Sequence, residues 1–170
     1  MREVILIAAM TQDRAIGSKN RMTWDVPEEF DTFLAAVAGN VVLMGRTSYE
    51  MFEPDLGDTV MVAVSSTMTE IPGAVVCPTV EAALEAARSY GKPVFVSGGA
   101  SIYAQTLPYA DELWLSIIDD EYVEKDAAHD AFFPEFDESD WELTMEGKRS
   151  RYTYRVYKRR EGRPYKQWGS

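Results

Sequence analysis

The chain has 170 residues, of which 46% are hydrophobic, so it is long enough to fold as one domain with a sizeable core. Its net charge of −11 argues against a protein that binds nucleic acid by neutralising phosphates. It has no run of about 18 apolar residues and no basic-then-apolar leader, which argues against a membrane span and a signal peptide. We therefore expect a cytoplasmic protein.

The single cysteine and the single histidine narrow the chemistry further. Cys77 alone excludes an internal disulfide and a cysteine-based metal cage. With His129 as the only histidine, nucleophilic catalysis of the Ser-His or Cys-His kind is disfavoured. We expect no metal.

Patterns typical of strands and helices alternate along the chain with short connections. Apolar runs typical of strands occupy residues 4–10, 41–44, 60–65, 74–77, 93–97 and 112–118. Helical patterns occupy residues 27–37, 47–52, 80–90 and 100–107. Residues 141–146 and 151–158 have the pattern of an antiparallel pair. This order predicts one α/β sandwich with a mostly parallel sheet over residues 1–160, followed by a poorly ordered tail at 161–170.

Glu29 stands near the start of the first predicted helix, where Pro27 fits the first turn because its missing N–H costs nothing there. It lies four residues before Phe33 and therefore shares a side of the helix with an apolar stripe, with Trp24 just upstream. A carboxylate at the edge of such a stripe is costly unless it meets a polar partner. Glu29 is thus a candidate functional acid, although acidic residues also stabilise first turns through the helix dipole.

Two junctions between a strand and a helix have features that bind anions. Gly45-Arg46-Thr47-Ser48 follows one strand pattern, and Gly98-Gly99-Ala100-Ser101 follows another. Free N–H groups at a helix start attract phosphate, glycine allows close approach of the backbone, and Arg46 adds a cation. Ser65-Ser66-Thr67 adds hydroxyls at the end of a further strand. Together these features predict a dinucleotide spread across strand ends, although the G-x-G-x-x-G fingerprint is not present.

Several segments keep a fixed order and spacing from residue 3 to about 158. They are Ile7-Ala8-Ala9, Asp13-Arg14-Ala15-Ile16-Gly17, Trp24, Glu29-Phe30 with Phe33, Met44-Gly45-Arg46-Thr47-Ser48, Ser65-Ser66, Gly98-Gly99 with Ile102-Tyr103, and Asp130 to Pro134. In combination they resemble the dihydrofolate reductase family. The resemblance implies a three-layer sandwich whose eight-stranded, mixed and mostly parallel sheet is flanked by helices. It also implies NADPH as hydride donor, a pterin as substrate and a cis peptide between the two glycines; we expect a monomer.

The resemblance assigns roles to individual residues. Glu29 would be the active-site acid, with Trp24 and Ser116 holding the water that delivers a proton. Substrate would contact Ile7, Ala8, Phe30, Phe33, Phe52, Leu56 and Tyr103. NADPH would contact Ala9, Ile16, Gly17, Gly45, Arg46, Thr47, Ser48, Ser65, Ser66, Thr67, Gly98, Gly99, Ala100, Ser101, Ile102 and Tyr103. Burial among aromatic side chains is expected to raise the pKa of Glu29, and one carboxylate can accept both the 2-amino group and N3–H of a pterin.

Departures from the family pattern leave the substrate open. Thr59 stands where members that bind folate commonly carry an arginine for the glutamate tail, and no Lys or Arg occurs between Arg46 and Arg88. Ser97 replaces a more usual apolar residue before the glycine pair. We predict reduction of 7,8-dihydrofolate to 5,6,7,8-tetrahydrofolate. The alternatives are reduction of a pterin without that tail or of the pyrimidine intermediate of riboflavin synthesis, and a non-catalytic nucleotide-binding protein.

Overall fold

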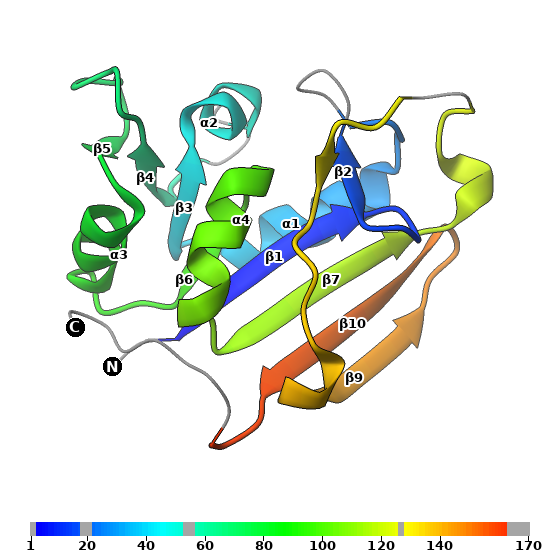
Figure 1. Ribbon diagram of the computed structural model, residues 1–170. Coiled ribbons are helices and arrows are strands. Elements are labelled where there is room, and N and C mark those ends of the chain that lie inside the picture. Colours follow the sequence, from blue (N-terminus) through cyan, green and yellow to red (C-terminus); the bar gives the residue numbers. More distant parts are fainter. Residues whose placement is uncertain (1–2, 18–21, 53–56, 126–127, 163–170) are drawn as a thin grey trace.

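The structure of the chain, a computed structural model, describes residues 3–17, 22–52, 57–125 and 128–162. Its centre is an eight-stranded sheet (Figure 1). In spatial order the strands are β5 (Val75–Cys77), β4 (Val60–Val64), β3 (Val41–Gly45), β6 (Val94–Val96), β1 (Val4–Met10), β7 (Glu112–Ile118), β10 (Tyr152–Arg159) and β9 (Trp141–Lys148). β10 alone runs in the direction opposite to the other seven strands, so the predicted mixed, mostly parallel sheet is confirmed.

Helices cover both faces of the sheet and make the predicted three layers (Figure 1). They are α1 (Pro27–Val37), α2 (Arg46–Phe52), α3 (Val80–Arg88) and α4 (Ala100–Thr106). Successive strand side chains point to opposite faces, so Ile5 and Ile7 of β1 pack in one buried cluster with Phe33 of α1. Leu6 of the same strand packs in the other cluster, with residues of α3 and α4 such as Leu84.

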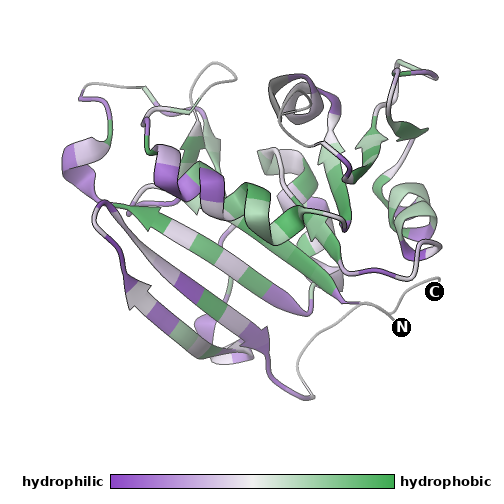
Figure 2. Cartoon of the chain, turned by 180° about the vertical axis from the view of Figure 1, so that it is seen from behind, coloured by the Kyte–Doolittle hydropathy of each residue, from purple (hydrophilic) through white to green (hydrophobic). Residues whose placement is uncertain are grey.

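Hydropathy follows this burial (Figure 2). The central strands β1, β3 and β6 are mostly hydrophobic because helices cover both of their faces. The edge strand β9 and its neighbour β10 instead mix hydrophilic and hydrophobic residues, because most of β9 is exposed and most of β10 is only partly buried. None of the described helices is long and apolar enough to cross a membrane.

A second, two-stranded sheet lies over the C-terminal end of β1 and was not predicted. It pairs β2 (Ala15–Gly17) with β8 (Ala131–Phe132) in antiparallel orientation. Three short 3-10 helices, η2 (Leu107–Tyr109), η3 (Asp120–Tyr122) and η4 (Glu138–Asp140), were not predicted either. The other predicted elements are present, with bounds that match the prediction or differ from it by one or two residues. Residues 163–170 of the predicted tail lie outside the described residues.

Candidate active site

A cavity of about 480 Å³ opens where the parallel strands β1, β3 and β6 end, between α1, α2 and α4. Most of the residues assigned to the site from the sequence line it. These are Ile7, Ala8, Ala9, Ile16, Gly17, Glu29, Phe30, Phe33, Gly45, Arg46, Thr47, Ser48, Gly98, Gly99, Ala100, Ser101, Ile102 and Tyr103. Crevices outside the carboxyl ends of parallel strands are the usual ligand sites of open α/β sheets, so the topology and the residues agree.

Glu29 enters the cavity from the first turn of α1. Its backbone N–H donates to the carbonyl of Val26, and its side chain lies on the buried stripe that continues through Phe33 and Val37. The rings of Phe30 and Phe33 stack beside it with their centroids 5.9 Å apart. Only 8% of Glu29 is exposed, and this desolvation raises the pKa of its carboxyl from 4.5 to about 7. The predicted rise is confirmed.

Ser116 of β7 is the polar partner of this carboxylate. It is buried, and its hydroxyl donates a hydrogen bond to Glu29, which favours the charged form and partly offsets the rise in pKa. The strand pairing explains the approach, since Ser116 lies beside Ala9 of β1, a residue that lines the cavity. The structure therefore brings together two of the three predicted catalytic residues.

Tyr103 of α4 forms part of the cavity wall. Its hydroxyl donates to the backbone carbonyl of Ile7 over 2.7 Å, so the helix is fixed to β1 at the mouth of the site. The phenol is buried, and its pKa is raised by desolvation and by the negative charge of Glu29. Tyr103 therefore stays a neutral hydrogen-bond donor at physiological pH.

Backbone alone forms the wall between β3 and β6. The N–H of Gly45 donates to the carbonyl of Gly98 over 2.8 Å, and the peptide between Gly98 and Gly99 is cis, as the resemblance implied. Gly98 has a φ of +106°, and a Cβ there would lie 3.1 Å from the ring of Tyr103. Glycine is required at this position because both the backbone angle and the space exclude a side chain.

Arg46 lines the cavity at the start of α2 and reaches towards the end of β4. Its Nη1 donates to the sulfur of Met68 over 3.3 Å, and its Nε lies 3.5 Å from Oε1 of Glu50. Ser65 Oγ accepts from the backbone N–H groups of Met68 and Thr67. The predicted hydroxyls of Ser65, Ser66 and Thr67 do not line the cavity itself, but Met68 places Arg46 next to them.

Three further predictions have other outcomes. Trp24 is buried with Val26, Ile118 and Tyr152 and does not line the cavity. The side chain of Phe52 and all of Leu56 lie outside the described residues. Thr59 is buried too, with its hydroxyl 3.5 Å from the carbonyl of Val37 at the end of α1, and it presents nothing to the cavity.

Four lining residues were missing from the predicted set: Met22, Ser97, Asp130 and Ala131. Asp130 and Ala131 reach the site because β8 pairs with β2, and the N–H of Asp130 donates to the carbonyl of Gly17 over 3.3 Å. The segment from Asp130 to Pro134 had matched the family pattern, which was the available signal. Such short strands have no periodicity of their own.

Comparisons with known proteins agree with this geometry. A family model described as "Dihydrofolate reductase" matches residues 3–160. The chain is 33% identical over 169 residues to dihydrofolate reductase HdrB of Haloferax volcanii, covering 92% of this chain and 84% of that protein. It is 33% identical over 141 residues to dihydrofolate reductase of Bacillus subtilis, covering 82% and 80%. A solved structure of Enterococcus faecalis dihydrofolate reductase, complexed with NADP(H) and RAB-propyl, shares the fold with a TM-score of 0.80 at 24% identity, covering 94% of this chain and 97% of that one.

Proposed function

Because the chain belongs to the dihydrofolate reductase family, whose members are NADPH-dependent oxidoreductases, we propose that it reduces 7,8-dihydrofolate to 5,6,7,8-tetrahydrofolate. The observation that carries this choice is Glu29, a carboxyl buried among aromatic rings in a cavity of about 480 Å³. A single carboxylate there can accept both the 2-amino group and N3–H of a pterin. The stacked rings of Phe30 and Phe33 supply an apolar wall for the flat ring system.

Glu29 has the properties needed to assist protonation of the substrate. Reduction adds a hydride at C6 and a proton at N5 of the ring. With a pKa of about 7, the carboxyl exchanges its proton near neutral pH, where an ordinary glutamate stays ionised. Ser116 holds the carboxylate from the side of β7. In this proposal Ser116 also holds the water through which the proton reaches N5.

The residues at the strand ends fit NADPH, which supplies the hydride when bound. Gly45, Gly98 and Gly99 present bare backbone to the cavity, and a Cβ on Gly45 would come within 3.3 Å of Ile102. Arg46 provides a cation for the 2′-phosphate of the adenosine ribose, with hydroxyls of Ser65, Ser66 and Thr67 as further partners. We assign the glycines to the close passage of the cofactor and Arg46 to the choice of NADPH over NADH.

Thr59 favours a second candidate, the reduction of a pterin that has no glutamate tail. Its buried hydroxyl faces the end of α1, and Arg46 is the only Lys or Arg among the described residues that line the cavity. A carboxylate tail would therefore lack a bidentate cation at the position where the family commonly supplies one. The ring-binding residues are the same for both candidates, so the tail decides between them.

A steady-state assay of NADPH oxidation separates the candidates. Dihydrofolate, dihydrobiopterin and the pyrimidine intermediate of riboflavin synthesis are compared side by side, with kcat and KM measured for each. We expect dihydrofolate to give the highest kcat/KM of the three. A higher value for dihydrobiopterin would establish the second candidate, and turnover of the pyrimidine alone would overturn both.

A further inference from the structure

Ser97 follows β6 directly and carries a buried polar atom with no partner inside the protein. The residue is 7% exposed and lines the cavity. Its backbone N–H donates to the carbonyl of Leu43 over 3.0 Å. Its Oγ is the one buried side-chain oxygen or nitrogen in the described part of the chain that has no hydrogen-bond partner there. The other buried hydroxyls of the region do have partners, such as Thr106, which donates to the carbonyl of Ile102 over 2.7 Å.

The strand register shows which wall of the cavity Ser97 belongs to. Val96 pairs with Leu6 of β1 and with Leu43 of β3, so the next position places Ser97 beside Ile7 and Met44. Paired residues of parallel strands point to the same face of the sheet. Ile7 and Met44 belong to the buried cluster that packs under α1. Ser97 therefore lies on the α1 side of the sheet, the side from which Glu29 enters the cavity.

An unpaired buried hydroxyl costs free energy, because it has lost its bonds to water without replacing them. Alanine would fill almost the same space without that cost. The cost is recovered when a ligand group occupies the cavity and bonds the hydroxyl, which can act as both donor and acceptor. A flat heterocycle whose edge alternates carbonyl, N–H and ring nitrogen atoms offers such a group.

We propose that Ser97 is a substrate-binding residue whose hydroxyl forms a hydrogen bond with the polar edge of the pterin ring that Glu29 holds. The proposal rests on the proposed function, because it needs a pterin in the cavity. It adds a specificity determinant at a position where the family more usually has an apolar side chain. The hydroxyl selects for rings with a polar atom at this point and against rings that are apolar there.

The proposal predicts opposite effects of one substitution on folding and on binding. Ser97→Ala removes an unpaired hydroxyl from the ligand-free protein, so the free energy of unfolding should stay the same or rise. The same change removes one hydrogen bond from the complex, so the Kd for dihydrofolate should rise by a factor of about 2 to 10. If the hydroxyl had a purely structural role, its removal would instead lower the free energy of unfolding and leave the Kd unchanged.

The test measures urea unfolding of the ligand-free protein and the Kd values of dihydrofolate and NADPH, using quenching of tryptophan fluorescence. Parent, Ser97→Ala and Thr106→Val are compared, the last as a control that removes a buried hydroxyl already bonded to backbone. We expect Ser97→Ala to weaken dihydrofolate alone, with the loss appearing in KM more than in kcat. Thr106→Val should leave both Kd values near those of the parent.

The outcomes separate this inference from the proposed function. If the parent binds dihydrofolate and Ser97→Ala binds it equally well, the role of Ser97 is overturned while the proposed function stands. If Ser97→Ala weakens NADPH but not dihydrofolate, the hydroxyl faces the cofactor and the proposal is wrong. If the parent binds neither dihydrofolate nor dihydrobiopterin, the proposed function fails and this inference fails with it.

Discussion

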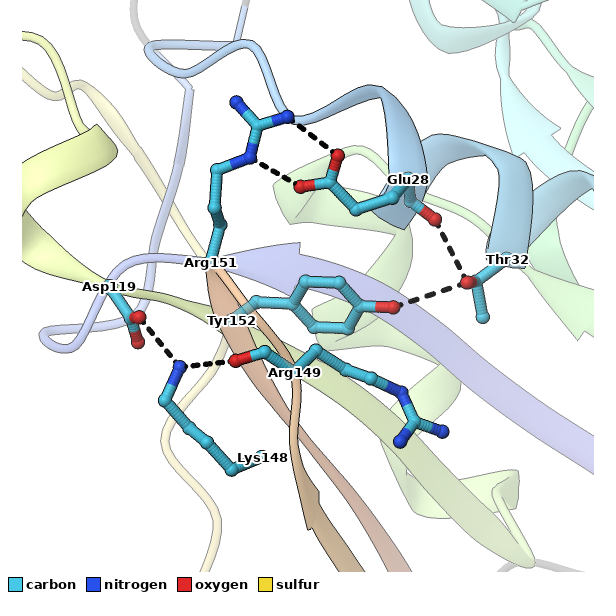
Figure 3. Close-up of polar contacts among 7 residues, drawn as sticks. All are labelled: Glu28, Thr32, Asp119, Lys148, Arg149, Arg151 and Tyr152. Carbon is cyan, nitrogen blue, oxygen red and sulfur yellow. Dashed lines mark hydrogen bonds and ion pairs between the residues drawn. The ribbon is translucent and has the colours of Figure 1, made fainter.

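Glu28 and Glu29 are consecutive residues in the first turn of α1, yet their carboxyl groups lie in opposite surroundings. Glu29 faces the cavity, where desolvation raises its pKa from 4.5 to about 7. Glu28 faces outwards, where Arg151 donates to both of its carboxylate oxygens over 2.6 and 2.7 Å (Figure 3). This pairing lowers the pKa of Glu28 from the same starting value. Position on the helix, and not residue type, decides which carboxyl can act as an acid near neutral pH.

The outward face also fixes the helix that carries Glu29. The Thr32 hydroxyl donates to the carbonyl of Glu28 over 2.9 Å and shares a hydrogen bond with the Tyr152 hydroxyl at 3.1 Å (Figure 3). Tyr152 is the first residue of β10, and Arg151 directly precedes it. The last residue of β9, Lys148, is in turn held beside the end of β7, because its Nζ lies 2.7 Å from Oδ2 of Asp119. The first turn of α1 is thus bonded to the sheet on one side while Glu29 projects into the cavity on the other.

The largest expected effect comes from replacing the Glu29 carboxyl by an amide. Glu29→Gln should lower kcat/KM for dihydrofolate by about 10²-fold or more, because the ionisable group that anchors the ring and assists protonation is gone. Glu28→Gln is the matched control in the same turn and should keep kcat/KM near that of the parent. NADPH affinity should be retained in both. Equal losses in the two variants would remove the distinction between the faces.

The raised pKa of Glu29 should also make the stability of the protein depend on pH. The native pKa of Glu29 lies above its unfolded value, so the folded protein holds this proton more tightly, and stability falls as pH rises from 4.5 through 7. The loss amounts to about 3 kcal/mol in the free energy of unfolding and levels off above the native pKa. Glu29→Gln should therefore become more stable relative to the ligand-free parent across this range in urea unfolding. A difference that does not change with pH would contradict the raised pKa.

Cofactor binding can be tested by comparing two arginines, because Arg46 lines the cavity and Arg151 does not. Arg46→Ala should weaken NADPH by about 10- to 100-fold while changing NADH little, as expected when charge-assisted bonds to a phosphate are lost. Arg151→Ala should leave the ratio of the two affinities unchanged. Equal weakening of both cofactors by Arg46→Ala would place this side chain at the pyrophosphate or in a structural ion pair.

The smallest expected effect concerns the pair that holds α1 from outside. Exposed ion pairs contribute little to stability, so Arg151→Met should lower the thermal midpoint only slightly. Because the pKa of Glu28 is lowered, the pair stabilises the protein above pH 4.5, and this contribution disappears as pH falls through the native pKa. Arg155→Met, which breaks the exposed pair with Glu146 at 2.7 Å, is the control. Both variants should keep kcat near that of the parent, as Glu28→Gln should; a loss of kcat in Arg151→Met alone would contradict this expectation.

The sequence was sufficient to predict the buried face of α1 but not the contacts of its outward face. Pro27 and the spacing of Glu29, Phe33 and Val37 are local signals, and the structure buries these last three together. The Glu28–Arg151 pair joins residues 123 positions apart, and no local pattern specifies such a partner. Which charges pair across the fold depends on tertiary packing.

The same limit explains the errors at the cavity. Tertiary pairing placed β8 against β2 and brought Asp130 and Ala131 to the site, although neither strand is long enough to show alternation. Ser97 was visible in the sequence only as an unusual residue before the glycine pair. Its significance needed the structure, because an unpaired hydroxyl is defined by neighbours from other strands. The parallel strands, by contrast, follow from continuous apolar runs covered on both faces.

The titration of the Glu29 carboxyl tests the central claim most directly. The carboxyl carbons of the ligand-free protein can be followed by NMR across pH 3 to 9, roughly the range that spans the ordinary and the raised value. Glu29→Gln assigns the signal of Glu29, and Glu28→Gln assigns that of its neighbour. We expect the Glu29 signal to titrate near pH 7 and the Glu28 signal to titrate below 4.5. A Glu29 midpoint at the ordinary value of 4.5 would contradict the account.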